Sequence, residues 1–129
     1  GITACQYAMV VGEWAKIPTL HQVIGAFRHG FMEVVETGGG AVVFAPPGCS
    51  AESAWALARD LEQYGVKVLV VVHGHLHAVQ DQPSNQPVVN EFLSPILDII
   101  PVQMAADTLA HNRGFGNGFR YMGKVVTKV

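Results

Sequence analysis

Charged residues, cysteines and long apolar runs are all scarce in this chain of 129 residues, and each shortage excludes a class of protein. Only 14% of the residues are charged, against about 25% in an average domain, so we expect an oligomer or a part of a larger protein. The two cysteines, Cys5 and Cys49, are too few for a disulfide framework, which favours a reducing, cytoplasmic compartment. No apolar run approaches the roughly 18 residues that span a bilayer.

The charge balance also argues against two kinds of partner. The formal net charge is -2, from 8 basic and 10 acidic residues in no long run, so we expect neither a nucleic-acid partner nor a membrane partner. No basic leader with a cleavage site opens the chain. Because the chain begins at Gly1 without a methionine, we expect Gly1 to be a cloning remnant and the natural protein to extend upstream.

Three stretches of the sequence have the pattern of helices. Residues 4–17 are apolar nearly all round, as a buried helix would be, and Pro18 should end that helix. Residues 19–36 predict one or two further helical segments. A long apolar helix is expected over residues 94–112, because it opens with a Ser-Pro pair that suits a first turn.

The middle of the chain has the pattern of a βαβ unit. The runs AVVFA at 41–45 and KVLVVV at 67–72 are typical of parallel strands that are buried on both faces. Between them an amphipathic helix is expected from an N-cap at Ser50 to a terminating glycine at Gly65. This order of strand, helix and strand places the chain in the α/β class.

The predicted sheet is smaller than a complete one. Residues 73–87 read as a loop, and VVN at 88–90 is at most a short third strand. The helix over residues 4–17 has no strand before it, although α/β folds alternate the two elements. We therefore expect that an upstream strand is missing and that the sheet has an open edge, which proteins normally cover.

Two residues near the N-terminus are candidates for proton chemistry. Glu13 lies in the most apolar helix, where burial without a partner would raise its pKa and make it a base near neutral pH. The alternative is that Glu13 pairs with Lys16 or reaches solvent. His29 precedes the flexible Gly30 and could transfer protons, although a capping histidine has the same pattern.

Two further motifs have weaker functional signals. His73, His75 and His77 would face one side of an extended chain, so a zinc site is one hypothesis and a solvated loop is the other. Zinc would need a fourth ligand, and Asp81 is the only carboxylate close by in the sequence. The loop at 46–50 leads into a helix N-terminus, which favours anions, but it has no phosphate-loop lysine.

Glu13 and His29 stand 16 residues apart in GEWAKIPTLHQVIGAFRHGFMEVVE, and two more characteristic stretches follow, PILDIIPVQMAADTLAHNRG and RYMGKVVTKV. These stretches resemble the sugar isomerase (SIS) domain proteins, in particular the isomerising glutamine–fructose-6-phosphate aminotransferases. That family has the same spacing between an acid and the histidine of an E-x-K-H-G-P element, a similar apolar helix with the P-L-Q-x-L-A pattern, and a similar basic tail. The resemblance runs from about Cys5 to Val129.

The resemblance implies an SIS-type three-layer sandwich, with a mainly parallel sheet flanked by helices and without its first strand. It also implies an aldose–ketose phosphosugar site in a homodimer that needs no cofactor and no metal. Glu13 would move a proton between C1 and C2 of the sugar. His29 would open the sugar ring in the neighbouring subunit's site. Lys124 would contact the open sugar or form a Schiff base with it, and Arg120 would bind the substrate.

Three departures from the family pattern support an alternative function. Val10 and Gly12 stand where the family commonly has lysines, and Phe31 replaces the proline of the H-G-P element. A non-catalytic phosphosugar-binding or regulatory module would tolerate these changes. The resemblance further implies that the serine- and threonine-rich loop that binds the phosphate lies in a first subdomain, which these residues do not include. A metal-binding protein built on His73, His75 and His77 is the third hypothesis.

Overall fold

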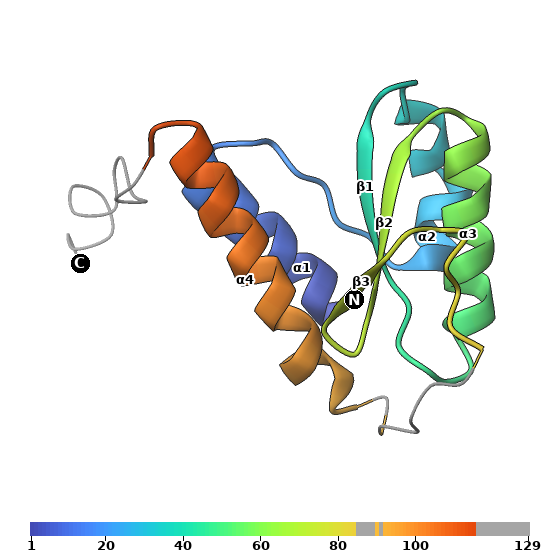
Figure 1. The fold of residues 1–129 in the computed structure, drawn as a ribbon. Coiled ribbons are helices and arrows are strands. Elements are labelled where there is room, and N and C mark those ends of the chain that lie inside the picture. Colours follow the sequence, from blue (N-terminus) through green and yellow to red (C-terminus); the bar gives the residue numbers. More distant parts are fainter. Residues whose placement is uncertain (85–89, 91, 116–129) are drawn as a thin grey trace, which may run out of the picture.

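The structure is a computed structural model that describes residues 1–84, 90 and 92–115. Figure 1 shows helices on both sides of a small sheet, with α1 and α4 on one side and α2 and α3 on the other. In chain order the elements are α1 (Ile2–Val10), the π-helical turn η1 (Val11–Ala15), α2 (Ile24–His29), the 3₁₀ turn η2 (Phe31–Val34), β1 (Gly40–Phe44), α3 (Ala51–Gln63), β2 (Lys67–Val72), β3 (His75–His77) and α4 (Ser94–Asn112). This arrangement confirms the α/β class.

The sheet contains both parallel and antiparallel pairs of strands. Its order is β1-β2-β3, with β1 parallel to β2 and β3 antiparallel to β2. The parallel pair confirms the predicted βαβ unit. The prediction of a loop over 73–87 is wrong at β3, because His73 and Gly74 both have positive φ and form a two-residue turn that lets the chain pair back onto β2. The described sheet is therefore mixed rather than mainly parallel, and most of the expected strand at 88–90 lies outside the described residues.

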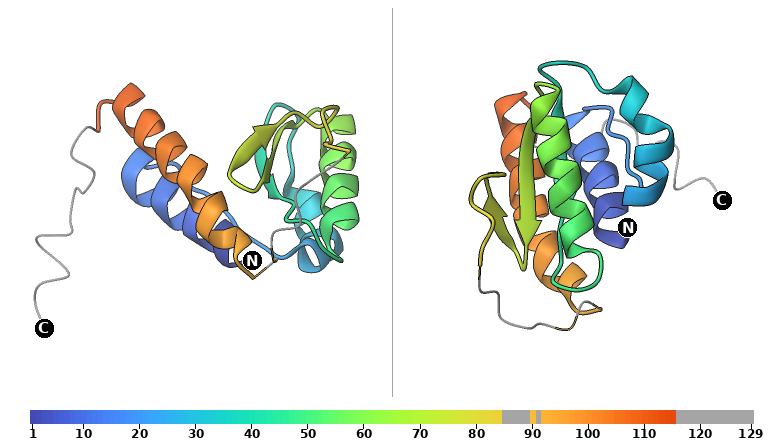
Figure 2. Two further views of the ribbon diagram at one scale, coloured as in Figure 1. Left: turned by 60° about the horizontal axis from the view of Figure 1, so that its bottom comes forward. Right: turned by 90° about the vertical axis from the view of Figure 1, so that its right-hand side faces the viewer.

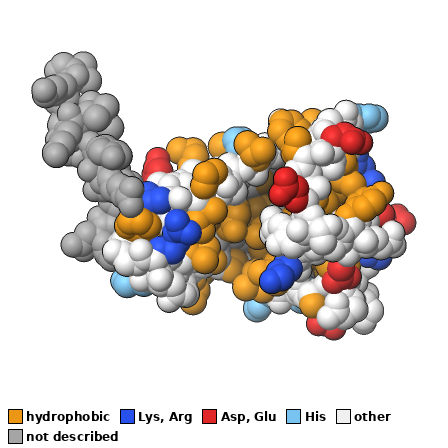
Figure 3. Space-filling model, turned by 90° about the horizontal axis from the view of Figure 1, so that it is seen from above, with side chains coloured by type: hydrophobic (Ala, Val, Ile, Leu, Met, Phe, Trp, Pro, Cys, Tyr) orange, Lys and Arg blue, Asp and Glu red, His pale blue; other side chains and the backbone are white. Residues whose placement is uncertain are grey.

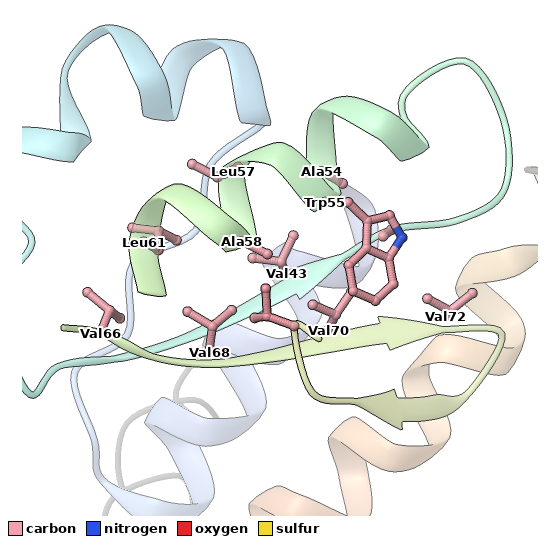
Figure 4. Packing of buried hydrophobic residues seen from close by; sticks show 12 residues of the cluster. Val43, Ala54, Trp55, Leu57, Ala58, Leu61, Val66, Val68, Val70 and Val72 are labelled. Atoms are coloured by element: carbon pink, nitrogen blue, oxygen red, sulfur yellow. The ribbon is translucent and has the colours of Figure 1, made fainter. Parts of the chain in front are cut away.

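One face of the sheet is closed by α3 over a hydrophobic core (Figure 4). Trp55 and Leu61 of α3 pack on Val70 and its neighbours in β2, and all three side chains are fully buried. The helix ends as predicted at Gly65, whose N–H donates to the Glu62 carbonyl while the next N–H reaches the Leu61 carbonyl. This pair of bonds and the φ of +79° at Gly65 form a Schellman motif.

The other face of the sheet is approached by the pair α1 and α4, which lie side by side (Figure 2). Val11 and Ala15 of the first helical segment contact Ala106 and Ala110 of α4. The predicted helix over 4–17 is two pieces, because its last turn is π-helical and Lys16 has a left-handed backbone with φ of 57°. None of the helices in the described ranges is both long and apolar enough to cross a membrane.

The prediction that both strands are buried on both faces is wrong for part of the face that turns towards α1 and α4, where Val71 is buried but its neighbours on that face are not. Val68, Val70 and Val72 of β2 face α3 and are buried, but Leu69 between them is 47% exposed. Val42 and Phe44 of β1 are only half-buried. The cause is that α1 and α4 diverge from the sheet instead of lying flat on it, as Figure 1 shows.

Candidate functional site

The hollows that the described residues form include a large apolar groove and a smaller pocket near the N-terminus of α3. The groove has a volume of about 1190 Å³ and runs between the α1 and α4 pair, residues 17–24 and strand β1. Figure 3 shows this hollow in the molecule, with hydrophobic side chains along it. The pocket has a volume of about 690 Å³ and is lined by residues of α2, α3 and the loop before α3.

Three buried polar side chains line the groove at the start of α1 and α4. They are Thr3 of α1 and Ser94 and Asp98 of α4. The carboxylate of Asp98 is 1% exposed and accepts a hydrogen bond of 2.9 Å from the backbone N–H of Gly74. This bond holds the turn between β2 and β3 against α4. Asp98 therefore joins α4 to the sheet at the carboxyl end of β2.

Burial raises the pKa of the Asp98 carboxyl group above its usual range. The hydrogen bond from Gly74 and the nearby His73 both oppose this rise, because they favour the charged carboxylate. The two ring nitrogens of His73 are buried and have no hydrogen-bond partner among the described residues. This corner is the most polar buried part of the groove, and it lies where open α/β sheets generally bind ligands.

The smaller pocket joins α2 to the N-terminus of α3. Arg28 of α2 lines it, with Cys49 and Ser50 of the preceding loop and Ser53 of the first turn of α3. The guanidinium of Arg28 forms a salt bridge of 2.7 Å with Asp60 on the outer part of α3. Hydroxyl groups, a helix N-terminus and a cation suit an anion, but the pairing with Asp60 already neutralises the cation.

The structure places Glu13 in an environment different from the expected one. Its side chain is exposed, although it lies in the π-helical turn at the end of an apolar helix. Val11, Trp14 and Ala15 of this turn pack in the cluster shared with α4, whereas Glu13 is not part of it. The ammonium group of Lys16 donates a hydrogen bond to the backbone carbonyl of Glu13. The expectation of a buried, dry carboxylate is therefore wrong for the single chain, and the catalytic role of Glu13 stays a prediction.

His29 is the last residue of α2 and is also exposed. Helix α2 lies beside α3, whereas the helix that carries Glu13 lies beside α4 on the opposite side of the sheet (Figure 1). A single chain therefore does not bring Glu13 and His29 together. Arg120 and Lys124, the two predicted residues of the tail, lie outside the described residues.

The three histidines of the predicted metal site do not face one side. His73 is not extended, because its φ is 49° in the turn, and its ring nitrogens are buried. His77 packs edge-on against Trp55 with ring centroids 6.4 Å apart, while His75 is exposed. Within residues 1–84, 90 and 92–115, no three histidine, cysteine, aspartate or glutamate side chains are grouped as metal ligands would be.

Sequence reasoning missed Asp98, the one fully buried carboxylate among the described residues. The signal that drew attention to Glu13, an acid within an apolar helix, is equally present in the stretch SPILDII around Asp98. A helix that is apolar nearly all round does not reveal which of its residues face the core. The two carboxylates were therefore indistinguishable until the packing of α1 and α4 was known.

The comparisons with known proteins support the fold. No protein-family model matches the sequence. No curated protein sequence matches it either. Among solved structures, the chain is similar to the C-terminal domain of glucosamine-fructose-6-phosphate aminotransferase from Francisella tularensis, with a TM-score of 0.71 and 20% identity over 87% of this chain. The match covers 32% of the solved chain, so residues 1–129 correspond to about a third of it. The resemblance predicted from the sequence is thus confirmed at the level of the fold.

Proposed function

We propose that residues 1–129 form a phosphosugar-binding SIS module of a cytoplasmic aldose–ketose isomerase or isomerising aminotransferase, of the fructose 6-phosphate and glucosamine 6-phosphate type. The observation that carries this proposal is the fold, which matches the C-terminal domain of an aminotransferase named for these sugars. The spacing of 16 residues between Glu13 and His29 supports it independently, because it comes from the sequence alone.

In this function the chain moves protons on an open-chain sugar phosphate. His29 transfers a proton at the ring oxygen and so opens the ring. Glu13 then removes a proton from one of the carbons C1 and C2 and returns it to the other, so that it ends the cycle as it began. Lys124 contacts the open sugar or forms a Schiff base with its carbonyl, and Arg120 binds the substrate.

The positions of Glu13 and His29 favour a site shared by two copies of the chain. The two residues lie on opposite sides of one sheet, so a complete site needs Glu13 of one copy and His29 of another. A second copy over Glu13 would also remove its carboxylate from water and so give the base a dry site. The exposure of Glu13 in the single chain is consistent with this dimer.

The test combines binding with complementation between variants. We expect saturable binding of fructose 6-phosphate by titration calorimetry, and slow isomerisation to glucose 6-phosphate. Glu13→Gln should lower turnover by about a hundredfold or more, whereas Glu62→Gln on α3 is the matched control and should not. An equal mixture of Glu13→Gln and His29→Asn should regain about a quarter of the activity, because half of a C2 dimer's random pairs contain one intact site.

Two results would contradict the proposal. Absence of saturable sugar phosphate binding would remove the function from residues 1–129. The second result is that the mixture of variants does not regain activity, although each variant still folds and dimerises. It would mean that both residues act within one copy or lie outside the site.

A second function is favoured by Val10, Gly12 and Phe31, which stand where the resemblance expects two lysines and a proline. In that case the chain is a non-catalytic phosphosugar-binding module. It would bind fructose 6-phosphate with the same affinity in the wild type and in Glu13→Gln, and neither protein would isomerise it. Binding without turnover therefore selects this second function.

A further inference from the structure

The helical turn that carries Glu13 ends in a backbone conformation that does not suit its residue. Lys16, which follows η1, has a left-handed backbone with φ of 57° and ψ of 37°. Glycine and asparagine are the usual residues at such a helix end, because larger side chains crowd the backbone there. A lysine in this conformation indicates a role other than folding, since strained residues gather at functional sites.

The packing around Lys16 explains the left-handed backbone but not the choice of lysine. Ala15 before it and Ile17 after it both pack in the cluster that joins η1 to α4. A left-handed residue between them turns the chain so that both side chains reach this cluster. Glycine would turn the chain in the same way without steric cost. The lysine side chain therefore serves something other than the turn of the backbone.

The side chain of Lys16 returns to the residue that carries the candidate base. Its ammonium group donates a hydrogen bond to the backbone carbonyl of Glu13. Carbonyls at the end of a helix lack the donor of a following turn, and a lysine side chain can supply one. The turn around Glu13 is thus held from behind by Val11 and Ala15, which pack against α4, and at its end by the ammonium group. Within residues 1–20 the only basic side chain is that of Lys16.

We propose that Lys16 is a positioning residue for proton transfer by Glu13. This inference rests on the proposed function, in which the Glu13 carboxylate moves a proton between C1 and C2 of the sugar. The hydrogen bond from Lys16 holds the main chain of Glu13 and so limits where the carboxylate lies relative to those carbons. A displacement of about 1 Å can lower the rate about a hundredfold. Lys16 acts through Glu13 and need not touch the substrate.

The alternative is that Lys16 only stabilises the end of the helix, and a glycine variant separates the two roles. Lys16→Gly removes the ammonium group but also relieves the left-handed backbone, so its urea midpoint should stay close to that of the wild type. If Lys16 served the helix end alone, this variant would therefore be fully active. If Lys16 positions Glu13, the variant folds but turns over slowly.

Three variants of Lys16 and one control lysine test the proposal with fructose 6-phosphate as the substrate. Lys16→Met and Lys16→Gly should each lower kcat by about tenfold to a hundredfold and leave KM within about twofold. Lys16→Arg keeps a cationic donor and should retain at least about half of kcat. Lys67→Met is the matched control, because Lys67 is an exposed lysine at the start of β2, and its kcat should equal that of the wild type.

Two further measurements respond to positioning and not to stability. With fructose 6-phosphate deuterated at C1, the isotope effect on kcat should be larger in Lys16→Met than in the wild type, because a displaced carboxylate slows the proton transfer itself. In the protein without substrate, the carbonyl carbon of Glu13 should change its NMR chemical shift in Lys16→Met and Lys16→Gly, because the charged donor is lost. The shift should be unchanged in Lys67→Met.

Three results would overturn the role of Lys16 alone, each in a protein that Glu13→Gln inactivates. The first is full activity of Lys16→Met or Lys16→Gly. The second is a loss in Lys16→Arg as large as in Lys16→Met, because a cationic donor would then not be what matters. The third is an unchanged carbonyl shift of Glu13 in Lys16→Met.

Failure of the proposed function gives a different pattern. Full activity of Glu13→Gln, or no turnover in the wild type, would contradict the catalytic role of Glu13. Lys16 would then have no base to position, so this result would overturn both proposals together.

Discussion

The two faces of the sheet differ in how completely helices cover them, although the same strands supply both. On the face towards α3, Val43 and Val70 are buried under Trp55 and Leu61. On the face towards α1 and α4, Leu69 remains 47% exposed beside a groove of about 1190 Å³. Within β2, Val68, Val70 and Val72 are thus buried in the core under α3, whereas on the opposite face Val71 is buried and Leu69 is not.

The difference shows that the strands carry more apolar surface than the helices of the described residues cover. The run KVLVVV is apolar at every position after its lysine, which is typical of a strand between two layers of helices. In the structure α4 contacts the sheet through the turn at Gly74, and it diverges from β1. Val42, Phe44 and Leu69 therefore line the groove instead of packing under a helix.

The largest expected effect comes from the closed face. Trp55→Ala removes a side chain that is 2% exposed and should lower the free energy of unfolding by about 3–5 kcal/mol, because a cavity is left in the core. Tyr64→Ala, at an exposed aromatic residue just after α3, is the control and should change it by less than about 0.5 kcal/mol. Urea unfolding measures both. Similar losses in the two variants would mean that the α3 face is not the main core.

An intermediate loss of unfolding free energy is expected at Gly74, in the turn through which the sheet contacts α4. An Ala Cβ at Gly74 would lie 2.8 Å from the Leu97 carbonyl oxygen of α4, at a φ of +76°. Gly114 has nearly the same φ, +77°, with nothing near its Cβ position. Each Gly→Ala change should cost about 1–2 kcal/mol for the left-handed backbone, and Gly74→Ala should cost about 1–3 kcal/mol more for the clash. Equal losses in urea would show that the turn does not rest on α4.

The smallest effect is a pH dependence at Asp98. Its raised pKa means that the folded state binds more protons than the unfolded state between the ordinary value of 3.8 and the raised value. The stability that protonated Asp98 contributes is therefore complete below 3.8 and is lost as the pH rises through the folded pKa. Asp98→Asn removes this loss, while its amide oxygen can still accept from Gly74.

The measurement is urea unfolding of wild type and Asp98→Asn from about pH 3 to about pH 8. The variant should gain stability relative to the wild type as the pH rises, and the difference should level off above the raised pKa. A difference that stays constant with pH, or that favours the wild type at high pH, would mean that burial does not control this carboxylate.

Elements that rest on local signals were predictable from the sequence. The βαβ unit, the glycine end of α3 and the bounds of α4 follow from apolar runs, capping residues and the Ser-Pro start. Strand β3 was not predictable, because its three residues form a strand only by pairing with β2 across a turn in which a histidine adopts positive φ. Pattern in the sequence shows neither that pairing nor its antiparallel direction.

The candidate site was less predictable than the fold. An apolar pattern all round a helix marked both Glu13 and Asp98 as unusual, but only the packing of α1 on α4 decides that Asp98 is buried and Glu13 exposed. The family resemblance supplied the pairing of Glu13 with His29, and their separation by the sheet follows from the crossing of residues 17–24 to α2. Arg28 and Asp60 form their ion pair across two helices, which no sequence spacing indicates.

Among the described residues, the sheet is covered by α3 on one face, and the edge of β1 away from β2 has no partner strand. Hydrogen exchange of the β1 amides in the protein alone tests this arrangement most directly. We predict that the amides of Val43 and Ala45, which face β2, exchange at least about a hundredfold more slowly than those of Val42 and Phe44, which face the open edge. Equal protection of all four amides would contradict the claim, because it would mean that the edge of β1 is already covered.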